Sequence, residues 1–290
     1  MYKIAILGCE NSHADQFVNF IKNNEQFSGI EVVGAYTCDE TAEKNFHEKH
    51  GIYMAKNYDE FVGKIDGLIV TARDGRNHLK YARPYFADRI PMFIDKPITS
   101  STRDALELAR LAIENGVKLC GGSSCINFEE IKSLAEAVKN AEKCTVYGGS
   151  LRAPINMNNP YGDFWFYSQH LVQMMQAVFG YYPKTVKAYT SGAAVNVVVR
   201  YDEYDVFLNF VDMNFKYFIS ASLKDGVVSY TEPDTSKIFQ LEFMDFYTIL
   251  CGGEPRQSLK DFIAPVFVLE AIERSLKSGS EESVEEIKIG

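Results

Sequence analysis

The sequence lacks paired cysteines, clustered positive charge and long apolar runs, and each absence argues against a class of protein. Its six cysteines include no Cys-x-x-Cys pair, so we expect buried free thiols rather than disulfides or a zinc site. The net charge is −9 and no Lys- or Arg-rich run concentrates positive charge, which argues against a nucleic-acid partner. No uninterrupted apolar stretch reaches the length of a membrane span. The apolar run at the start is too short for a signal peptide and is soon followed by Glu10, so a cytoplasmic protein without a membrane partner is expected.

Histidine is also scarce, with five in the chain. His47 and His50 lie three residues apart on an expected helix, which is a spacing that can hold a metal ion. No third ligand is apparent beside them. The sequence therefore predicts surface histidines at these positions and no metal site.

The first third of the chain alternates short apolar strands with amphipathic helices. This alternation predicts right-handed βαβ units and a doubly wound, Rossmann-like parallel sheet. The expected strands are 2–7, 30–37, 67–72, 92–94 and 117–120, and the expected helices are 14–23, 41–50 and 103–115. At 290 residues the chain exceeds most single cores, so a second domain is expected to follow.

The character of the sequence changes after Gly122. Helices are expected over 128–140 and 170–179, followed by strands rich in aromatic and β-branched residues over 185–190, 194–201, 205–210 and 216–223. Turn signals between later strands favour a mostly antiparallel sheet. A last helix is expected over 259–277. The prediction is an α/β chain with an N-terminal parallel sheet and a C-terminal α+β domain.

The turn after the first expected strand runs from Gly8 to His13 (GCENSH). A dinucleotide turn needs glycine for the tight turn and for close approach of the pyrophosphate. Gly8 meets the first need, but Glu10 stands at the second position, where its Cβ would crowd the pyrophosphate and its carboxylate would repel it. Ser12 and Asp15 have the spacing of a helix capping box. A capped strand-to-helix turn without cofactor therefore stays open as the alternative.

Two further residues have the chemistry of a catalytic site. Lys96 follows a short apolar strand and precedes Pro97, and an ammonium group there can hydrogen-bond a substrate hydroxyl and stabilise a developing alkoxide. His170 precedes an apolar helical stretch, and imidazole titrates near neutrality, as a general acid or base requires. The alternatives are an exposed loop lysine and a histidine that only caps or packs.

The Gly8 turn, the Asp-Lys-Pro triplet and the helix-borne His170 occur in an order that resembles the Gfo/Idh/MocA oxidoreductases, and this resemblance spans nearly the whole chain. It implies NAD or NADP as cofactor and hydride transfer to or from a hydroxyl-bearing carbon of a sugar, cyclitol or similar small polyol. It also implies two domains, 1–122 for the dinucleotide and 123–290 for the substrate and dimerisation. A homo-oligomer through the C-terminal sheet follows from the same resemblance.

The resemblance assigns roles to residues of this sequence. Lys96 would position substrate and nicotinamide, and His170 would move the proton. Thr37 falls at the ribose position, with Asp39 two residues later, so the choice between NAD and NADP stays open. The catalytic residues expected are Lys96 and His170. The cofactor residues expected are Gly8, Glu10, Asn11, Ser12, His13, Thr37, Asp39, Arg73, His78 and Lys96.

Phe166 and Gln173 occupy positions where many relatives carry aspartate near the histidine. Phenylalanine does not titrate, and the amide of glutamine hydrogen-bonds without titrating. Together with Glu10, these departures motivate the alternative of a non-catalytic ligand-binding or regulatory relative.

Overall fold

The computed structural model describes residues 1–289, which divide into two compact units. The first contains Met1–Gly122 and Phe239–Phe262, together with Ile289, and the second contains Ser123–Ile238 and Ile263–Lys288. The sequence analysis divided the chain once, after residue 122, whereas the structure returns Phe239–Phe262 to the first unit. Among the described residues, no helix combines the length and apolar character that a membrane span requires.

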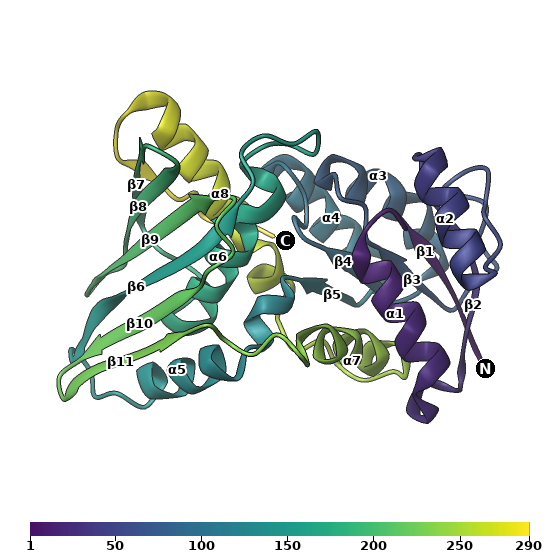
Figure 1. Ribbon diagram of the computed structural model, residues 1–290, viewed down its shortest axis with the longest axis horizontal. Helices are drawn as coiled ribbons and strands as arrows, with labels where there is room; N and C mark the ends of the chain where they lie inside the picture. Colours follow the sequence, from purple (N-terminus) through teal and green to yellow (C-terminus); the bar gives the residue numbers. More distant parts are fainter. Residues whose placement is uncertain (290) are drawn as a thin grey trace. The chain divides into compact units, whose positions relative to one another are not determined.

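The sheet of the first unit is all parallel, with strand order β2-β1-β3-β4-β5 (Figure 1). Its strands are β1 (Tyr2–Leu7), β2 (Ile30–Tyr36), β3 (Gly67–Val70), β4 (Met92–Asp95) and β5 (Leu119–Gly122). A single parallel bridge between Ala35 and Met54 extends the sheet beyond β2. With that bridge counted as a strand, the order is that of the Rossmann fold, and the predicted N-terminal fold is confirmed.

The α-helices of this unit are α1 (Ser12–Asn23), α2 (Glu40–His50), α3 (His78–Ala82), α4 (Thr102–Asn115) and α7 (Ile238–Leu250), and its 3-10 turns are η1 (Glu25–Phe27), η2 (Gly75–Asn77) and η3 (Arg83–Asp88). The sequence analysis assigned no element to α7. In the structure α7 completes the core, where Phe243 lies 5.2 Å from Phe17 of α1, ring centre to ring centre. Both rings are fully buried, with Ile4 and Ile6 of β1 in the same cluster.

Gly8 is required where it stands. Its φ is +90°, and a Cβ built there would lie 2.1 Å from the backbone nitrogen of Ala72. No other residue type fits so close an approach of two backbone segments. The turn therefore keeps the tight geometry that the first glycine of a dinucleotide turn provides.

The second unit contains a seven-stranded sheet of order β11-β10-β6-β9-β8-β7-β12, in which only β6 and β9 pair in parallel. Its strands are β6 (Val146–Ile155), β7 (Thr185–Ser191), β8 (Ala194–Arg200), β9 (Asp205–Asp212), β10 (Phe218–Leu223), β11 (Gly226–Thr231) and β12 (Glu282–Ser283). Its helices are η4 (Ser124–Asn127), α5 (Glu129–Lys139), α6 (Trp165–Phe179) and most of α8 (Leu259–Ser278). The predicted α+β domain with a mostly antiparallel sheet is confirmed.

The helix that carries His170 begins five residues earlier than predicted, at Trp165. Its N-cap is Phe164, which makes no side-chain capping hydrogen bond, so the sequence carries no capping signal at the true start. His170 consequently lies inside the helix, not at its beginning. Its side chain is buried there.

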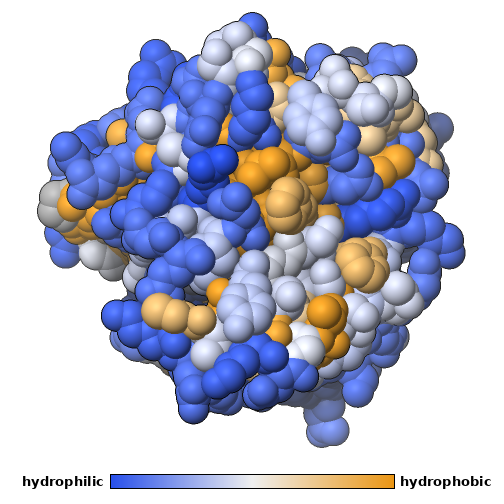
Figure 2. Space-filling model, turned by 90° about the vertical axis from the view of Figure 1, so that its left-hand side faces the viewer, coloured by the Kyte–Doolittle hydropathy of each residue, from blue (hydrophilic) through white to orange (hydrophobic). Residues whose placement is uncertain are grey.

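The two faces of the seven-stranded sheet differ. Helices α5 and α6 pack against one face. On the strands, large apolar side chains stay exposed, among them Tyr147, Tyr189, Phe207 and Val227. Figure 2 looks onto the side at the left of Figure 1, where apolar groups are interspersed with hydrophilic ones.

Candidate functional site

The turn after β1 lies at the topological switch point of the parallel sheet, because β1 has β2 on one side and β3 on the other. In such sheets ligands bind outside the carboxyl ends of the strands at this point. The structure brings three predicted cofactor residues together there. The Thr37 hydroxyl donates a hydrogen bond to Glu10 Oε2 at 2.8 Å, and the Arg73 backbone N–H donates one to Glu10 Oε1 at 3.1 Å.

The carboxylate of Glu10 is thus directed to the ends of β2 and β3. The end of β2 is where Rossmann folds present an acidic group to the hydroxyls of the adenosine ribose. Thr37 supplies no acid at that place, but the carboxylate that it contacts does. Glu10 therefore has a local role that its position in the turn did not suggest.

The predicted capping box of α1 is wrong. The helix begins at Ser12, which is exposed, and its N-cap is Asn11, whose Oδ1 accepts from the backbone N–H of His13 at 3.2 Å. Asp15 instead lies 2.6 Å from Nε2 of His50. His50 is buried, so the prediction of a surface histidine at this position is wrong. The sequence analysis placed the N-cap one residue too late, at Ser12 instead of Asn11, because asparagine caps a helix as well as serine does.

Asp39 caps α2. Its Oδ1 accepts from the backbone N–H groups of Thr41 and Ala42 at 2.9 and 3.0 Å, and its own N–H donates to Thr37 Oγ1. The carboxylate is therefore committed to the helix start.

His78 is fully buried, with Nε2 2.7 Å from the carbonyl oxygen of Ala72 and Nδ1 3.3 Å from that of Ile98. Burial lowers its pKa, so the ring is neutral and has one N–H to donate. The geometry assigns that proton to Nε2, the nearer nitrogen. His78 holds together two loops that follow β3 and β4 and contributes no cation.

Lys96 is 5% exposed, and the alternative of an exposed loop lysine does not hold. Asp95, which precedes it at the end of β4, is fully buried and accepts from Asn11 Nδ2 at 2.8 Å and from the Lys96 backbone N–H at 2.7 Å. Asp95 therefore ties Lys96 to the turn after β1. The first unit carries the predicted lysine and the predicted dinucleotide turn at one edge of its sheet.

A buried cluster that the sequence analysis missed lies beside Asp95. His13 Nδ1 is 3.3 Å from Asp95 Oδ1 and 3.2 Å from Glu242 Oε2. Burial alone would lower the pKa of His13, but the charges of Asp95 and Glu242 outweigh it and raise that pKa to about 10. Burial raises the pKa of Glu242 to about 7 despite the attraction of His13. Burial also opposes ionisation of Asp95, yet the charge of His13 holds its pKa below the ordinary value.

His170 lies in the second unit and contacts a residue that the sequence analysis did not single out. Its Nδ1 is 2.6 Å from Ser123 Oγ, and that oxygen also accepts from the Cys125 backbone N–H. The Ser123 backbone N–H donates to Gln173 Oε1 at 2.6 Å. A serine hydroxyl can donate to a neutral imidazole or accept from a protonated one, so Ser123 suits both states of a proton-transfer group.

Gln173, which occupies the position of a family aspartate, therefore holds the backbone of Ser123. The side chain of Ser123 in turn orients His170. The only sequence signal for this contact is that Ser123 follows the last parallel strand directly. Phe166 packs against Tyr161 and Tyr167, with ring centres 5.1 and 5.0 Å apart, and provides no proton-transfer group.

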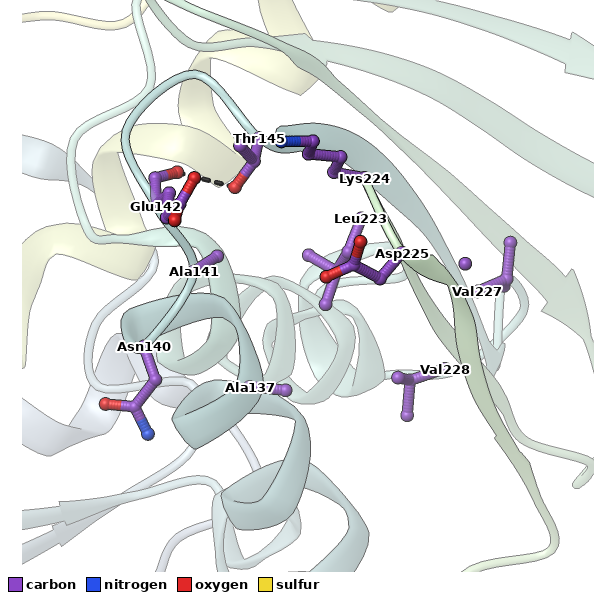
Figure 3. Close-up of a pocket in the computed structure, with 11 residues that line it drawn as sticks. Ala137, Asn140, Ala141, Glu142, Thr145, Leu223, Lys224, Asp225, Val227 and Val228 are labelled. Carbon is purple, nitrogen blue, oxygen red and sulfur yellow. Dashed lines mark hydrogen bonds between the residues drawn. The ribbon is translucent and has the colours of Figure 1, made fainter.

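The hollow shown in Figure 3 is a different place. It has a volume of about 440 Å³ and lies between the end of α5 and the turn that joins β10 to β11. Its charged lining groups are Glu142, Lys224 and Asp225. None of the predicted site residues lines it.

The comparison with family models gives a match for the N-terminal domain. Residues 2–123 match the oxidoreductase family with NAD-binding Rossmann fold, GFO_IDH_MocA. The predicted relationship to the Gfo/Idh/MocA oxidoreductases is thereby confirmed for the N-terminal domain. A comparison of the sequence with curated proteins finds no match.

Solved structures extend the likeness in fold to nearly the whole chain. The WlbA dehydrogenase from Bordetella pertussis, in complex with NADH and UDP-GlcNAcA, is 15% identical, with a TM-score of 0.84 and 99% of each chain covered. The scyllo-inositol dehydrogenase from Lactobacillus casei, with bound NAD(H) and scyllo-inositol, is 12% identical, with a TM-score of 0.83 and 98% of this chain and 99% of that chain covered. The myo-inositol 2-dehydrogenase from Lactobacillus plantarum is 13% identical, with a TM-score of 0.81 and the same coverage.

Proposed function

We propose that this protein is an NAD(P)-dependent oxidoreductase that moves a hydride between nicotinamide and a hydroxyl-bearing carbon of a sugar, cyclitol or similar small polyol. One observation carries the proposal. Asp95 joins buried Lys96 to the turn at the switch point of a domain that matches an NAD-binding family. The inositol and sugar-nucleotide dehydrogenases of similar fold support the substrate class.

The residues at the carboxyl ends of the parallel strands in the first unit are suited to bind a dinucleotide. Gly8 provides the tight turn, and the carboxylate of Glu10 at the end of β2 provides acceptors for ribose hydroxyls. That same carboxylate would repel the 2′-phosphate of NADP, so we propose NAD as the preferred cofactor. When bound, the dinucleotide supplies the hydride acceptor or donor.

The chain's own residues supply the rest of the chemistry. Lys96 would hydrogen-bond the substrate oxygen and stabilise negative charge on it. His170 would accept the hydroxyl proton at Nε2 during oxidation and return it during reduction, while Ser123 holds Nδ1.

The second candidate is a non-catalytic relative that binds a ligand without hydride transfer. Two observations favour it: Phe166, at a position where many relatives carry aspartate, packs against Tyr161 and Tyr167, and Glu10 places a Cβ in the turn where glycine is usual. It differs from the leading proposal in predicting no turnover with any dinucleotide.

Calorimetric titration with NAD, NADH, NADP and NADPH tests the proposed function. We expect NAD to bind more tightly than NADP, and Glu10→Gln to reduce this preference about tenfold because a charged acceptor is lost. Glu40→Gln removes an exposed acid from the start of α2 and serves as the charge-matched control.

Each other result of this titration has a defined meaning. Absence of binding at millimolar concentration of all four nucleotides would contradict the dehydrogenase proposal and favour the second candidate. If Glu10→Gln tightened NAD and NADP equally, Glu10 would act only by repelling phosphate and would have no role at the ribose.

We also propose a homo-oligomer that forms through the exposed face of the seven-stranded sheet. Phe207 of β9 is 52% exposed, and several apolar side chains on the same sheet are exposed as well, as is typical of surfaces that bind a partner. Phe207→Asp is expected to weaken self-association at least about tenfold in light-scattering or sedimentation measurements. Tyr182→Asp, which changes an exposed aromatic residue outside the strands, is the control. A wild-type protein that is monomeric at all concentrations would contradict the proposal.

A further inference from the structure

The cluster of His13, Asp95 and Glu242 joins three distant segments of the first unit. His13 comes from the first turn of α1, Asp95 ends β4 and Glu242 lies in α7. All three residues are buried, and one potential ligand atom from each lies within 4.8 Å of the other two. The three groups are therefore already gathered about one point inside the domain.

These groups lack the hydrogen bonds that a buried cluster needs. Within residues 1–289, His13 Nδ1 and both carboxylate oxygens of Glu242 have no aligned hydrogen-bond partner, although Nδ1 and Oε2 are only 3.2 Å apart. Glu242 is 2% exposed, so bulk solvent does not reach its carboxylate. An unsatisfied buried carboxylate is costly, and a bound cation would remove that cost.

The charges of the three residues are compatible with a bound cation. Two carboxylates face one imidazole, which balances a single negative charge when it is protonated. The positive charge of Lys96 also helps to lower the pKa of Asp95. Asp245 adds negative charge beside Glu242, and it is paired with Arg256 at 3.0 Å. A divalent cation with a neutral imidazole would make the three-residue set neutral.

We propose that His13 Nδ1, Asp95 Oδ1 and Glu242 Oε2 bind a divalent transition-metal ion, with zinc as the best fit. A tetrahedral zinc site with bonds of about 2.0–2.1 Å has edges of about 3.3–3.4 Å. The two measured edges from His13 are 3.3 and 3.2 Å. One imidazole and two carboxylates are suitable zinc ligands, with a fourth position for water.

The surroundings of Asp95 support ligation. Asn11 Nδ2 donates to Asp95 Oδ2, and the Lys96 backbone N–H donates to Oδ1, so the carboxylate is held with Oδ1 beside His13. Partners of this kind, which hold a ligating carboxylate in place, are typical of metal sites. The ion would fasten α7 and α1 to the end of β4, so its role would be structural and independent of hydride transfer.

The test uses the whole protein and does not depend on activity. After removal of metal by a chelator and dialysis, zinc chloride is titrated calorimetrically, and cobalt chloride is added while the visible spectrum is recorded. We expect about one ion per chain, a cobalt spectrum typical of four-coordination, and a melting temperature at least about 5 °C higher with zinc.

Glu242→Gln and His13→Gln are each expected to abolish zinc binding and the zinc-dependent rise in melting temperature. His50→Gln removes another buried histidine that contacts a carboxylate of α1 and should bind zinc as the wild type does. If wild-type protein bound neither ion at about 100 µM, a concentration well above the Kd of structural zinc sites, and melted identically with and without zinc, the proposal would be overturned. A protonated His13 would then be the group that holds the two carboxylates.

Discussion

Replacing His170 with asparagine is expected to lower kcat by about 10²- to 10⁴-fold, the usual contribution of a general acid or base, with NAD affinity unchanged. Asparagine can keep a hydrogen bond to Ser123, but it has no group that titrates near neutrality. The variant should therefore also lose the limb of the pH–rate profile that His170 provides. Steady-state kinetics with a panel of cyclitols and sugars, oxidised in the presence of NAD, measures both effects.

Two further variants define the role of His170. Ser123→Ala should reduce kcat less than His170→Asn does and should shift the pH profile, since it removes the partner of Nδ1 and leaves the imidazole in place. His47→Asn changes an exposed histidine of α2 and is the control. Activity of His170→Asn within twofold of wild type would assign His170 to packing alone.

Replacing Lys96 with methionine is expected to lower kcat/KM by about 10²- to 10³-fold, the cost of losing one group that stabilises transition-state charge. Methionine has a similar unbranched chain, so the buried space stays filled while the ammonium group is lost. Lys96→Arg should recover only part of the activity, because guanidinium differs from ammonium in shape and reach. Steady-state kinetics together with NAD titration separates loss of turnover from loss of cofactor.

Lys80→Met, at an exposed position of α3, is the matched control. A Lys96→Met enzyme with wild-type kcat/KM would remove Lys96 from the reaction. It would leave the lysine a structural role beside Asp95.

The fold was predictable because its signals are local. The strands of the first unit are short, continuously apolar runs between amphipathic helices, as β3 and β4 illustrate with every residue buried. In the second unit, apolar residues alternate with more exposed ones along β8 and β9, and this alternation indicated a sheet with one buried face. Elements without such signals were missed or misplaced: β6 and α7 were not predicted, and α6 begins without a capping residue.

The candidate site was predictable only in part. Lys96 and His170 were identified from their positions after or within recognisable elements, and both are buried as functional groups often are. The absence of a metal site was inferred from the spacing of the cysteines and from His47 and His50. His13 was predicted to bind the cofactor from the turn after β1, because nothing in the neighbouring sequence reveals the carboxylate that α7 contributes.

The sequence by itself determined the two sheets, the glycine at the first turn and the identity of the lysine and histidine. Local backbone preference and apolar periodicity specify these features within a few residues. Only the tertiary structure decided that Glu10 reaches Thr37, 27 residues away, and that Ser123 holds His170 across 47 residues. Such contacts depend on how packed strands and helices bring distant side chains together, and no local pattern encodes that.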